Sequence, residues 1–426
     1  MEKSRIYIGG NIYGAGNIGD DAVLQGILRI LQFVAPQAVI TVGTYRGQRL
    51  EYLPSSLQYV DSSDIRQITA AIRQSDCFIS GGGTMIGDEL GLSFPLEYNA
   101  KLISMAKLCG KRVSMLGIGA NQLRKNEGMS IAKTIVGLCD LITVRDEESL
   151  HVCLELGAET GSTATTADPA FLLSAKRTTR TKDLKERLRA RGPIFGINVV
   201  NEAWTDLSTY KKGIAVACEY FFSKHGYLPV FFCNEVRPGN FFDFDANSQT
   251  AALLRCDHEL LEPIYYSPEE MIDILSNFEF VIGMRMHSLI FSAITGTPFI
   301  AISRVDKVDN FMKLLGLRNS GSVDVCEGRQ IIFDIERLLE GREAFQNQMA
   351  ERITLLRQDA LKNIDMLLNL MNEHRVLWHK ANASSLRFAM SGNKFHDQIQ
   401  RVLHGEITFA QIVRKLRKAF GQKGRM

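Results

Sequence analysis

Short apolar runs alternate with longer helical patterns along most of this chain, and this alternation limits the fold more than any other feature. Short apolar runs bounded by turn residues are typical of strands that are buried on both faces. Strands that alternate with helices are typical of a parallel, doubly wound sheet. In the first half the strand runs are Arg5–Gly10, Val39–Gly43, Cys77–Gly81, Val113–Gly119 and Leu141–Arg145, and the helical patterns between them are Asp20–Val34, Ile65–Gln74, Leu96–Cys109, Ser130–Cys139 and Glu147–Leu156.

A polar, basic stretch at 174–192 interrupts the alternation and indicates a connector with one solvated helix. The pattern then resumes with a strand Ile194–Val200, a helix Ser208–Lys224, a strand Leu228–Cys233, a helix near Ser248–Leu261 and a strand–helix–strand–helix segment Phe278–Leu317. We therefore predict an α/β fold with two Rossmann-like doubly wound domains, at 1–175 and 190–325, that face each other across a cleft. Apolar residues spaced by three or four positions between Phe345 and Met371 predict one long amphipathic helix within 326–378.

Size and composition fit a soluble two-domain protein. The 426 residues exceed the usual length of one domain, which is roughly 100–200 residues. No run is apolar for the length that a membrane span requires, and the first residues lack a signal-peptide pattern, so we expect a cytoplasmic protein. The eight cysteines include no CxxC pair and no zinc-type spacing, which favours reduced, buried thiols and predicts no metal.

Basic and imidazole side chains follow two strands of the segment Phe278–Leu317. Arg285 and His287 come after the first strand, and Arg304 and Lys307 come after the second. The ends of successive parallel strands open onto one crevice, where α/β proteins bind their ligands. Three cations and one titratable imidazole at such an edge indicate a small substrate with several negative charges, and therefore an enzyme.

His287 is the predicted proton-transfer group of this edge. It falls in the first turn of a helix expected at Met286–Thr295 and ended by Gly296. Unpaired N–H groups and the macrodipole attract anions there, and a bound anion in turn favours the imidazolium. Such a His exchanges protons near neutrality. The alternative is that His287 and Arg285 only cap and solvate the helix end.

The first glycine-rich turn follows the first strand. Gly14, Gly16 and Gly19 match the spacing of the dinucleotide fingerprint. The true fingerprint starts directly at the strand end and needs an acid after the second strand, and neither condition holds here. The more natural interpretation is a flexible turn in which Asn17 and Asp20 cap the next helix and face the cleft.

Two further turns carry candidate binding groups. Gly81, Gly82 and Gly83 let backbone amides approach a ligand and Thr84 adds a hydroxyl, although a tight turn that needs positive φ explains the glycines equally well. No nucleotide P-loop sequence is present. Arg145 ends a strand beside several acids, so it is either their structural partner or, together with Lys307, a holder of phosphate.

With these residues assembled, the chain resembles the polysaccharide pyruvyl transferase family. The matching motifs appear in the family's order over about residues 5–320, and the last hundred residues lie outside the shared pattern. The motifs are GNIGDDAVLQG (16–26), SGGGTMIGD (80–88), GIGA (117–120), VRDEES (144–149), ADPAF (167–171), GMRMHSLIFSAITGTPFIAI (283–302) and DKVDNF (306–311).

The resemblance implies a GT-B-like fold and a reaction that moves pyruvate from phosphoenolpyruvate to a sugar, forming a cyclic ketal. It implies that His287 is the general acid–base group and that Arg145, Arg285 and Lys307 hold the donor's phosphate and carboxylate. No cofactor is expected besides phosphoenolpyruvate as co-substrate. On the acceptor side the candidates are Asn17, Asp20, Gly82, Gly83 and Thr84.

The last segment, 379–426, predicts a basic helical tail. From Lys380 onward it holds ten Lys or Arg residues against two acids, and Phe409, Ile412 and Leu416 share one helical face. Such a helix either lies on an anionic membrane surface, at the inner face where a lipid-linked acceptor would be found, or packs on the protein. The aromatic-rich groove that nucleic acid requires is not visible. Two alternatives to pyruvyl transfer stay open: a GT-B glycosyltransferase that uses a nucleotide sugar, and a catalytically silent binding protein of the same fold.

Overall fold

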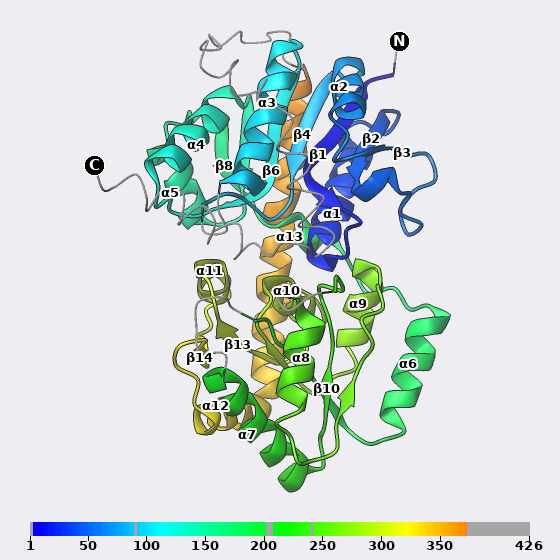
Figure 1. The fold of residues 1–426 in the computed structure, drawn as a ribbon, viewed down its shortest axis with the longest axis vertical. Helices are drawn as coiled ribbons and strands as arrows, with labels where there is room; N and C mark the ends of the chain where they lie inside the picture. The colour runs from blue at the N-terminus through cyan, green and yellow to red at the C-terminus, as the bar shows by residue number, and fades with distance from the viewer. Residues whose placement is uncertain (1–2, 89–91, 202–207, 239–241, 373–426) are drawn as a thin grey trace, which may run out of the picture. The chain divides into compact units, whose positions relative to one another are not determined.

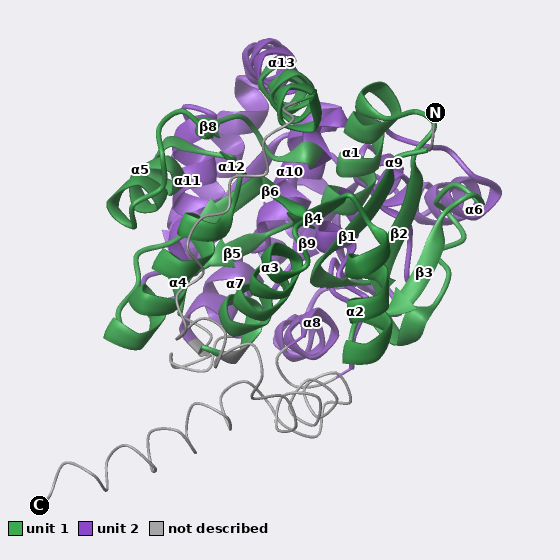
Figure 2. Cartoon of the chain, turned by 90° about the horizontal axis from the view of Figure 1, so that it is seen from above, with its two compact units in different colours: residues 1–15, 23–169, 359–426 green, residues 16–22, 170–358 purple. Residues whose placement is uncertain are grey.

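The structure, a computed structural model, describes residues 3–88, 92–201, 208–238 and 242–372. The chain divides into two compact units, which Figure 2 draws in different colours. Unit 1 comprises 1–15, 23–169 and the residues from 359 onward, and unit 2 comprises 16–22 and 170–358. Each unit is built on a parallel sheet with helices, so the predicted class of two parallel-sheet α/β domains followed by C-terminal helices is confirmed.

The sheet of unit 1 has the strand order β3-β2-β1-β4-β6-β7-β8, with β5 paired to β6. All of these pairs are parallel. The order reverses between β1 and β4, which is where doubly wound sheets bind ligands. The strands are β1 Arg5–Tyr13, β2 Val39–Thr44, β3 Gln58–Asp61, β4 Cys77–Gly81, β5 Thr84–Ile86, β6 Arg112–Ala120, β7 Leu141–Val144 and β8 Thr163–Thr165.

Helices of unit 1 lie against this sheet (Figure 1), and apolar side chains from them share its buried core. In α2, Ile68 and Ile72 lie one turn apart and are buried, while the Asp64 carboxylate caps the first turn by accepting from Arg66 N at 2.8 Å. Each fully buried Ile contributes about 1.5–3 kcal/mol. The helices are α1 Ile18–Val34, α2 Ile65–Gln74, α3 Tyr98–Leu108, α4 Asn126–Leu138 and α5 Glu147–Glu155.

The sheet of unit 2 is also parallel and has the order β11-β10-β9-β12-β13-β14, which reverses between β9 and β12. Its core contains aromatic rings from the strands and from the helix Ser208–His225. Phe195 stacks on Phe280 with ring centroids 4.5 Å apart. The strands are β9 Ile194–Asn198, β10 Leu228–Phe231, β11 Glu259–Leu260, β12 Val281–Gly283, β13 Phe299–Ser303 and β14 Gly321–Ser322.

Most helices of unit 2 lie where the sequence predicts them. The predicted helix Met286–Thr295 is confirmed as α10, and Gly296 ends it in the left-handed conformation with φ 69°. The other helices of unit 2 are α6 Thr179–Arg189, α7 Ser208–His225, α8 Asp243–Ala251, α9 Pro268–Leu275, α11 Asp306–Leu314 and α12 Gly328–Glu340. Short helical turns lie at Tyr45–Gly47 and Ser93–Glu97 in unit 1, and at Pro169–Leu172 where unit 1 passes into unit 2.

The predicted helix near Ser248–Leu261 is wrong. The helix there is α8, which begins at Asp243 and ends at Ala251, and Glu259–Leu260 instead forms the edge strand β11 beside β10. Pairing with the edge of a sheet overrides the local helical pattern over these residues.

The predicted long helix is confirmed as α13, Arg342–Asn372. Its residues up to 358 belong to unit 2 and those from 359 belong to unit 1. Asn363 is fully buried and accepts a hydrogen bond at 2.5 Å from the Thr143 hydroxyl of β7, which itself accepts from Gly117 N at 2.8 Å. The predicted basic tail, 379–426, lies outside the described residues.

Among the described residues, no helix is both long and apolar enough to cross a membrane. All eight cysteines are free, and only Cys109 and Cys256 are not fully buried.

Candidate functional site

His287 lies at the point where the strand order of unit 2 reverses. β9 and β12 are neighbours there, and their last residues, Asn198 and Gly283, pair in register. The chain leaves β12 through Arg285, and α10 begins at Met286, so His287 is the second residue of that helix. This position fits the rule that ligands of open α/β sheets bind at the carboxyl ends of the strands.

The imidazole of His287 is held against Gly19, the second residue of α1. His287 is 9% exposed. A Cβ atom placed on Gly19 would lie 2.3 Å from His287 Nδ1, a distance that real Cβ atoms do not show. Only glycine therefore allows the start of α1 to lie this close to the ring. The sequence drew attention to Gly19 through the dinucleotide spacing, whereas the structure gives it this steric role.

The segment 16–22 belongs to unit 2 because its backbone pairs with the chain after β10. Ile18 N donates to Asn234 O at 3.0 Å, and Val236 N donates to Gly16 O at 2.9 Å. The Asn17 side chain caps α1, since its Oδ1 accepts from Gly19 N at 3.0 Å. Asn17 and Asp20, which the sequence assigns to the acceptor side of the first domain, thus lie in the same unit as His287.

Arg285 is oriented by Asp243, a residue that the sequence did not single out. The Asp243 Oδ1 atom accepts from Arg285 Nε at 2.8 Å and lies 2.7 Å from Arg285 Nη2. Its Oδ2 atom accepts from the Asn198 side chain and from Asn234 N, both at 2.8 Å. Burial acts to lower the pKa of Arg285, but the carboxylates of Asp243, Glu235 and Asp20 outweigh it and raise that pKa. Arg285 is therefore a permanently charged, fixed group.

A second buried ion pair, also not predicted, joins Glu235 and Arg237. Arg237 Nε and Nη2 donate to the two carboxylate oxygens of Glu235 at 2.6 and 2.8 Å, and the guanidinium lies over the Phe242 ring at 4.7 Å. Burial acts to raise the pKa of Glu235, yet Arg237 and Arg285 lower it overall. No motif marks these residues, because they follow a short strand and lie in a loop.

Asp20 and Lys307 complete the charged groups of this site. Lys307 is half-buried in the first turn of α11, which follows Arg304, and Asp20 is half-buried in the first turn of α1. Burial raises the pKa of Asp20, while His287, Arg237 and Lys307 act to lower it and Glu235 acts to raise it. Three carboxylates thus accompany three cations near His287, a balance that the sequence-based expectation of a purely cationic edge did not include.

Arg145 lies in unit 1, directly after β7, and is 5% exposed. Its Nη2 atom donates to the Thr84 hydroxyl at 3.2 Å, and its guanidinium lies against Gly119, where a Cβ would be 2.5 Å from Nη2. Asp146 and Asp168 are ion partners at 3.6 and 3.7 Å. Within the described part of the chain, the buried Nε and Nη1 atoms of Arg145 meet no hydrogen-bond acceptor. Arg145 is thus a partner of acids, and its role in holding phosphate stays a prediction.

The glycine turn after β4 lies at the strand-order reversal of unit 1. Gly82 and Gly83 both have positive φ, 100° and 68°, so the turn itself requires glycine. Next to it, the buried Asn11 side chain approaches Gly82, and the Tyr13 hydroxyl donates to Gly81 O at 2.6 Å. The structure therefore brings Gly82, Gly83, Thr84 and Arg145 together in unit 1.

The predicted site residues form two groups. Asn17, Asp20, Arg285, His287 and Lys307 belong to unit 2, whereas Gly82, Gly83, Thr84 and Arg145 belong to unit 1. That both groups act on one substrate stays a prediction.

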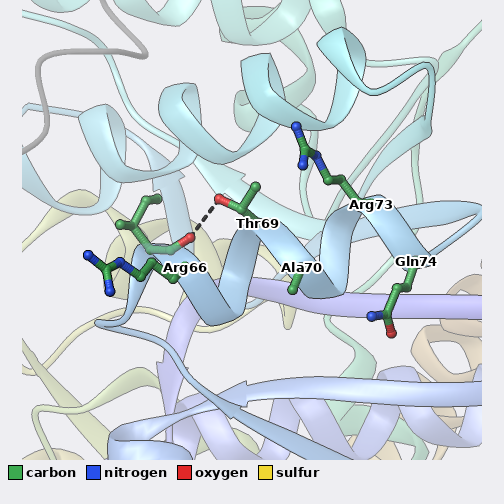
Figure 3. A pocket seen from close by; sticks show the side chains of 6 residues that line it. Arg66, Thr69, Ala70, Arg73 and Gln74 are labelled. Atoms are coloured by element: carbon green, nitrogen blue, oxygen red, sulfur yellow. Dashed lines mark hydrogen bonds between the residues drawn. The ribbon is translucent and has the colours of Figure 1, made fainter.

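A shallow pocket along α2 contains none of these residues. It is lined by Ile65, Arg66, Thr69, Ala70, Arg73 and Gln74, and Figure 3 shows the Thr69 hydroxyl bonded to Ile65 O at 2.6 Å within the helix. Thr69 therefore offers its hydroxyl to the backbone. Within the described ranges, no group of three or more His, Cys, Asp or Glu residues could hold a metal ion.

Solved structures with a similar fold include enzymes of UDP-sugars. The S. aureus MnaA structure with UDP is matched with a TM-score of 0.57 and 13% identity over 88% of this chain and 99% of that chain. UDP-GlcNAc 2-epimerase from Neisseria meningitidis, bound to UDP-GlcNAc, is matched with a TM-score of 0.55 and 12% identity over 87% of this chain and 100% of that chain. Likeness at this identity shows the fold alone, which is the GT-B fold.

Sequence comparison is more specific. The amylovoran biosynthesis protein AmsJ of Erwinia amylovora is 25% identical over 310 residues, which cover 68% of this chain and 71% of that protein. The model of the polysaccharide pyruvyl transferase family matches residues 17–306, which include Asn17, Arg145 and His287. The chain therefore belongs to the polysaccharide pyruvyl transferase family.

Proposed function

We propose that this protein transfers pyruvate from phosphoenolpyruvate to a sugar of a surface polysaccharide or of its lipid-linked precursor, and forms a cyclic ketal on two hydroxyl groups. Family membership supports a transferase, and the similarity to an amylovoran biosynthesis protein supports a role in making an extracellular polysaccharide. The observation that carries the proposal is the position of His287, fixed against Gly19 at the strand-order reversal of unit 2 among charged side chains.

The donor explains why such residues are needed. Phosphoenolpyruvate carries a phosphate and a carboxylate, which suit the forked guanidinium of Arg and the point charge of Lys. Asp243 holds Arg285 through Nε and Nη2, so the remaining N–H groups of Arg285 are available to orient the donor. We assign Lys307 to the phosphate, and we assign Arg145 to the donor as well, because its buried Nε and Nη1 atoms retain unused donors among the described residues.

His287 is assigned as the general acid that protonates the methylene carbon of the donor. A positioned acid–base group is worth about 10²–10⁴-fold in rate. Asn17, Asp20, Gly82, Gly83 and Thr84 are proposed for the acceptor sugar, because they offer carboxylate, amide, hydroxyl and backbone groups to its hydroxyls. The reaction as written needs no cofactor beyond the co-substrate phosphoenolpyruvate.

The test is to replace His287 by Gln and measure both phosphate release and the appearance of a ketal methyl signal on sugar acceptors. We expect kcat to fall by about 10²–10⁴-fold with an unchanged unfolding midpoint. The control is His151→Gln, since His151 is 67% exposed on α5 and pairs with its helical neighbour Glu155 at 3.0 Å, and it should retain parental kcat. Parental turnover by a folded H287Q variant would remove His287 from the mechanism.

The GT-B fold favours a second candidate, a glycosyltransferase that uses a nucleotide sugar. Selective binding raises the unfolding midpoint by mass action. A shift with phosphoenolpyruvate and none with UDP-sugars supports pyruvyl transfer, and the reverse result supports the second candidate. Binding of the basic tail to a membrane stays a prediction, because 379–426 lies outside the described residues.

A further inference from the structure

We propose that Asp20 is the second proton-transfer group of this site and acts as the general base that accepts the proton of the attacking sugar hydroxyl while His287 protonates the donor. This inference rests on the proposed pyruvyl transfer. It changes the role of Asp20 from a group that only binds the acceptor to one that takes part in the chemistry.

The backbone of Asp20 lies in a turn that is fixed beside His287. Gly19 contacts the His287 ring directly, and Asp20 is the next residue. The turn that carries both is fixed by Asn17, whose Oδ1 accepts from Gly19 N at 3.0 Å and from Asp20 N at 3.3 Å. Ile18 N is bonded to Asn234 O at 3.0 Å, so this turn is attached to the rest of unit 2. The backbone of Asp20 is therefore fixed one residue from the Gly19–His287 contact, and its carboxylate is close enough to His287 to interact with it electrostatically.

Asp20 is less buried than the other acids around it. It is half-buried. Asp21, the following residue, is fully buried and accepts from the Tyr265 hydroxyl at 2.6 Å. Glu235 and Asp243 are also buried, and each is already bonded to an arginine, Arg237 and Arg285 respectively. Among these four acids, Asp20 is the one that is not fully buried, so we assign to it the contact with the substrate hydroxyl.

Charged side chains surround Asp20 and act on its pKa. They are His287, Glu235, Arg237 and Lys307. Burial raises the pKa of Asp20 above its usual 3.8, while the positive groups limit that rise, so the carboxylate is more basic than that of an exposed Asp. A general base works best when its pKa is moved toward the operating pH.

The chemistry balances with these two groups. In the first half, a sugar hydroxyl loses its proton to the Asp20 carboxylate as its oxygen bonds to C2 of the donor, and the electron pair of the C2=C3 bond takes a proton from protonated His287. In the second half, the other hydroxyl gives its proton to the now neutral His287 as its oxygen bonds to C2. The C2–O bond to phosphate breaks, and the leaving phosphate takes the proton from Asp20. The products are the cyclic ketal and hydrogen phosphate, and both side chains return to their initial states.

The experiment compares Asp20→Asn with wild type by steady-state kinetics over a range of pH. In wild type the rate should fall at acidic pH as Asp20 is protonated, with an apparent pKa above 3.8. In D20N this acidic limb should disappear, kcat should fall about 10²–10⁴-fold, and KM for phosphoenolpyruvate should change little, because the lost interaction belongs to the transition state. Formate added to an Asp20→Ala variant should restore part of kcat, which a purely structural residue would not allow.

The matched control is Asp183→Asn, which removes an exposed carboxylate from α6 of the same unit and should leave kcat and the pH profile unchanged. Three outcomes would overturn the assignment of Asp20. They are parental kcat in D20N, an acidic limb that persists in D20N, and a D20A variant that formate does not activate while wild type is fully active. If wild type itself forms no ketal from phosphoenolpyruvate, the proposed function is overturned and the role of Asp20 with it.

Discussion

At the scale of single residues, the contact between Gly19 and His287 is the tightest constraint on the site. In Gly19→Ala the new Cβ would lie 2.3 Å from Nδ1, so the ring or the start of α1 must move. We expect kcat to fall on the order of 10²-fold, as a displacement of about 1 Å does elsewhere. The measurement is the same transfer assay.

Gly137→Ala is the control for this change. Gly137 lies in the last turn of α4, and a Cβ there would meet no atom within 4 Å. This variant should keep parental kcat and gain up to about 1 kcal/mol of stability. Full activity in G19A would show that catalysis does not depend on where this contact places the imidazole.

Residue patterns predicted part of the site and missed the rest for an identifiable reason. His287, Arg285 and Lys307 follow strands that the apolar pattern marks clearly, so their shared edge could be predicted. Asp243 begins a helix that the pattern placed too late, and its partner Arg285 is distant in sequence. Glu235 and Arg237 are close in sequence but lie in a loop that carries no periodic pattern. Buried ion pairs of this kind depend on the tertiary fold and leave no local signature.

At the scale of elements, the end of α13 is hydrogen-bonded to unit 1 through a buried side chain, Asn363. In Asn363→Ala the Thr143 hydroxyl loses its acceptor in an interior where Asn363 is fully buried. Leaving a buried polar group unsatisfied costs about 1–3 kcal/mol, so the free energy of unfolding should fall by that amount in urea titrations. The control Lys362→Ala changes the adjacent, exposed residue and should shift the free energy of unfolding by no more than about 0.5 kcal/mol. Equal stability of N363A and wild type would contradict this account.

Elements that bury a long apolar face were predicted well, and short ones were not. Helix α2 was predicted with its observed bounds, because Ile68 and Ile72 repeat at helical spacing after a capping Asp64. Strands β11 and β14 are two residues long, and their backbone pairing with longer neighbours defines them. No side-chain pattern of two residues distinguishes such an edge from a loop.

At the scale of the whole molecule, Glu270 should make stability depend on acid pH. Glu270 accepts from Arg180 Nε at 2.7 Å, from Ser267 N at 3.0 Å and from the Thr178 hydroxyl at 2.9 Å, and so joins α9 to the start of α6. Burial acts to raise its pKa, but Arg180, Ser267 and Thr178 lower it from 4.5 to about 2. A lowered pKa stabilises the fold above pH 4.5, and this contribution is lost as the pH falls from 4.5 through about 2.

The corresponding variant is Glu270→Gln. Because the Arg180 side chain is 47% exposed and therefore screened, we expect a loss on the order of 1–2 kcal/mol at pH 7. The difference from wild type should shrink between pH 4.5 and pH 2 in thermal unfolding of both proteins. Glu186→Gln, which changes an exposed acid of α6, should show no such convergence. A constant difference across this range would show that the Glu270 carboxylate does not carry the effect.

The repeated alternation of strands and helices was enough to predict two sheets, but the membership of two segments could not be predicted. Residues 16–22 continue into α1 of unit 1 and yet belong to unit 2, and the end of α13 belongs to unit 1. Both assignments follow from long-range contacts, such as those of Gly19 with His287 and of Asn363 with Thr143.

This exchange of segments determines how the gene could be divided. A polypeptide that starts at residue 170 would contain His287 but lack the segment 16–22, whose Gly19 contacts the His287 ring. One that stops at residue 169 would lack the end of α13, from residue 359, whose Asn363 is buried in unit 1. No single cut yields two self-sufficient halves, so each half should fold properly only when it is co-produced with the other.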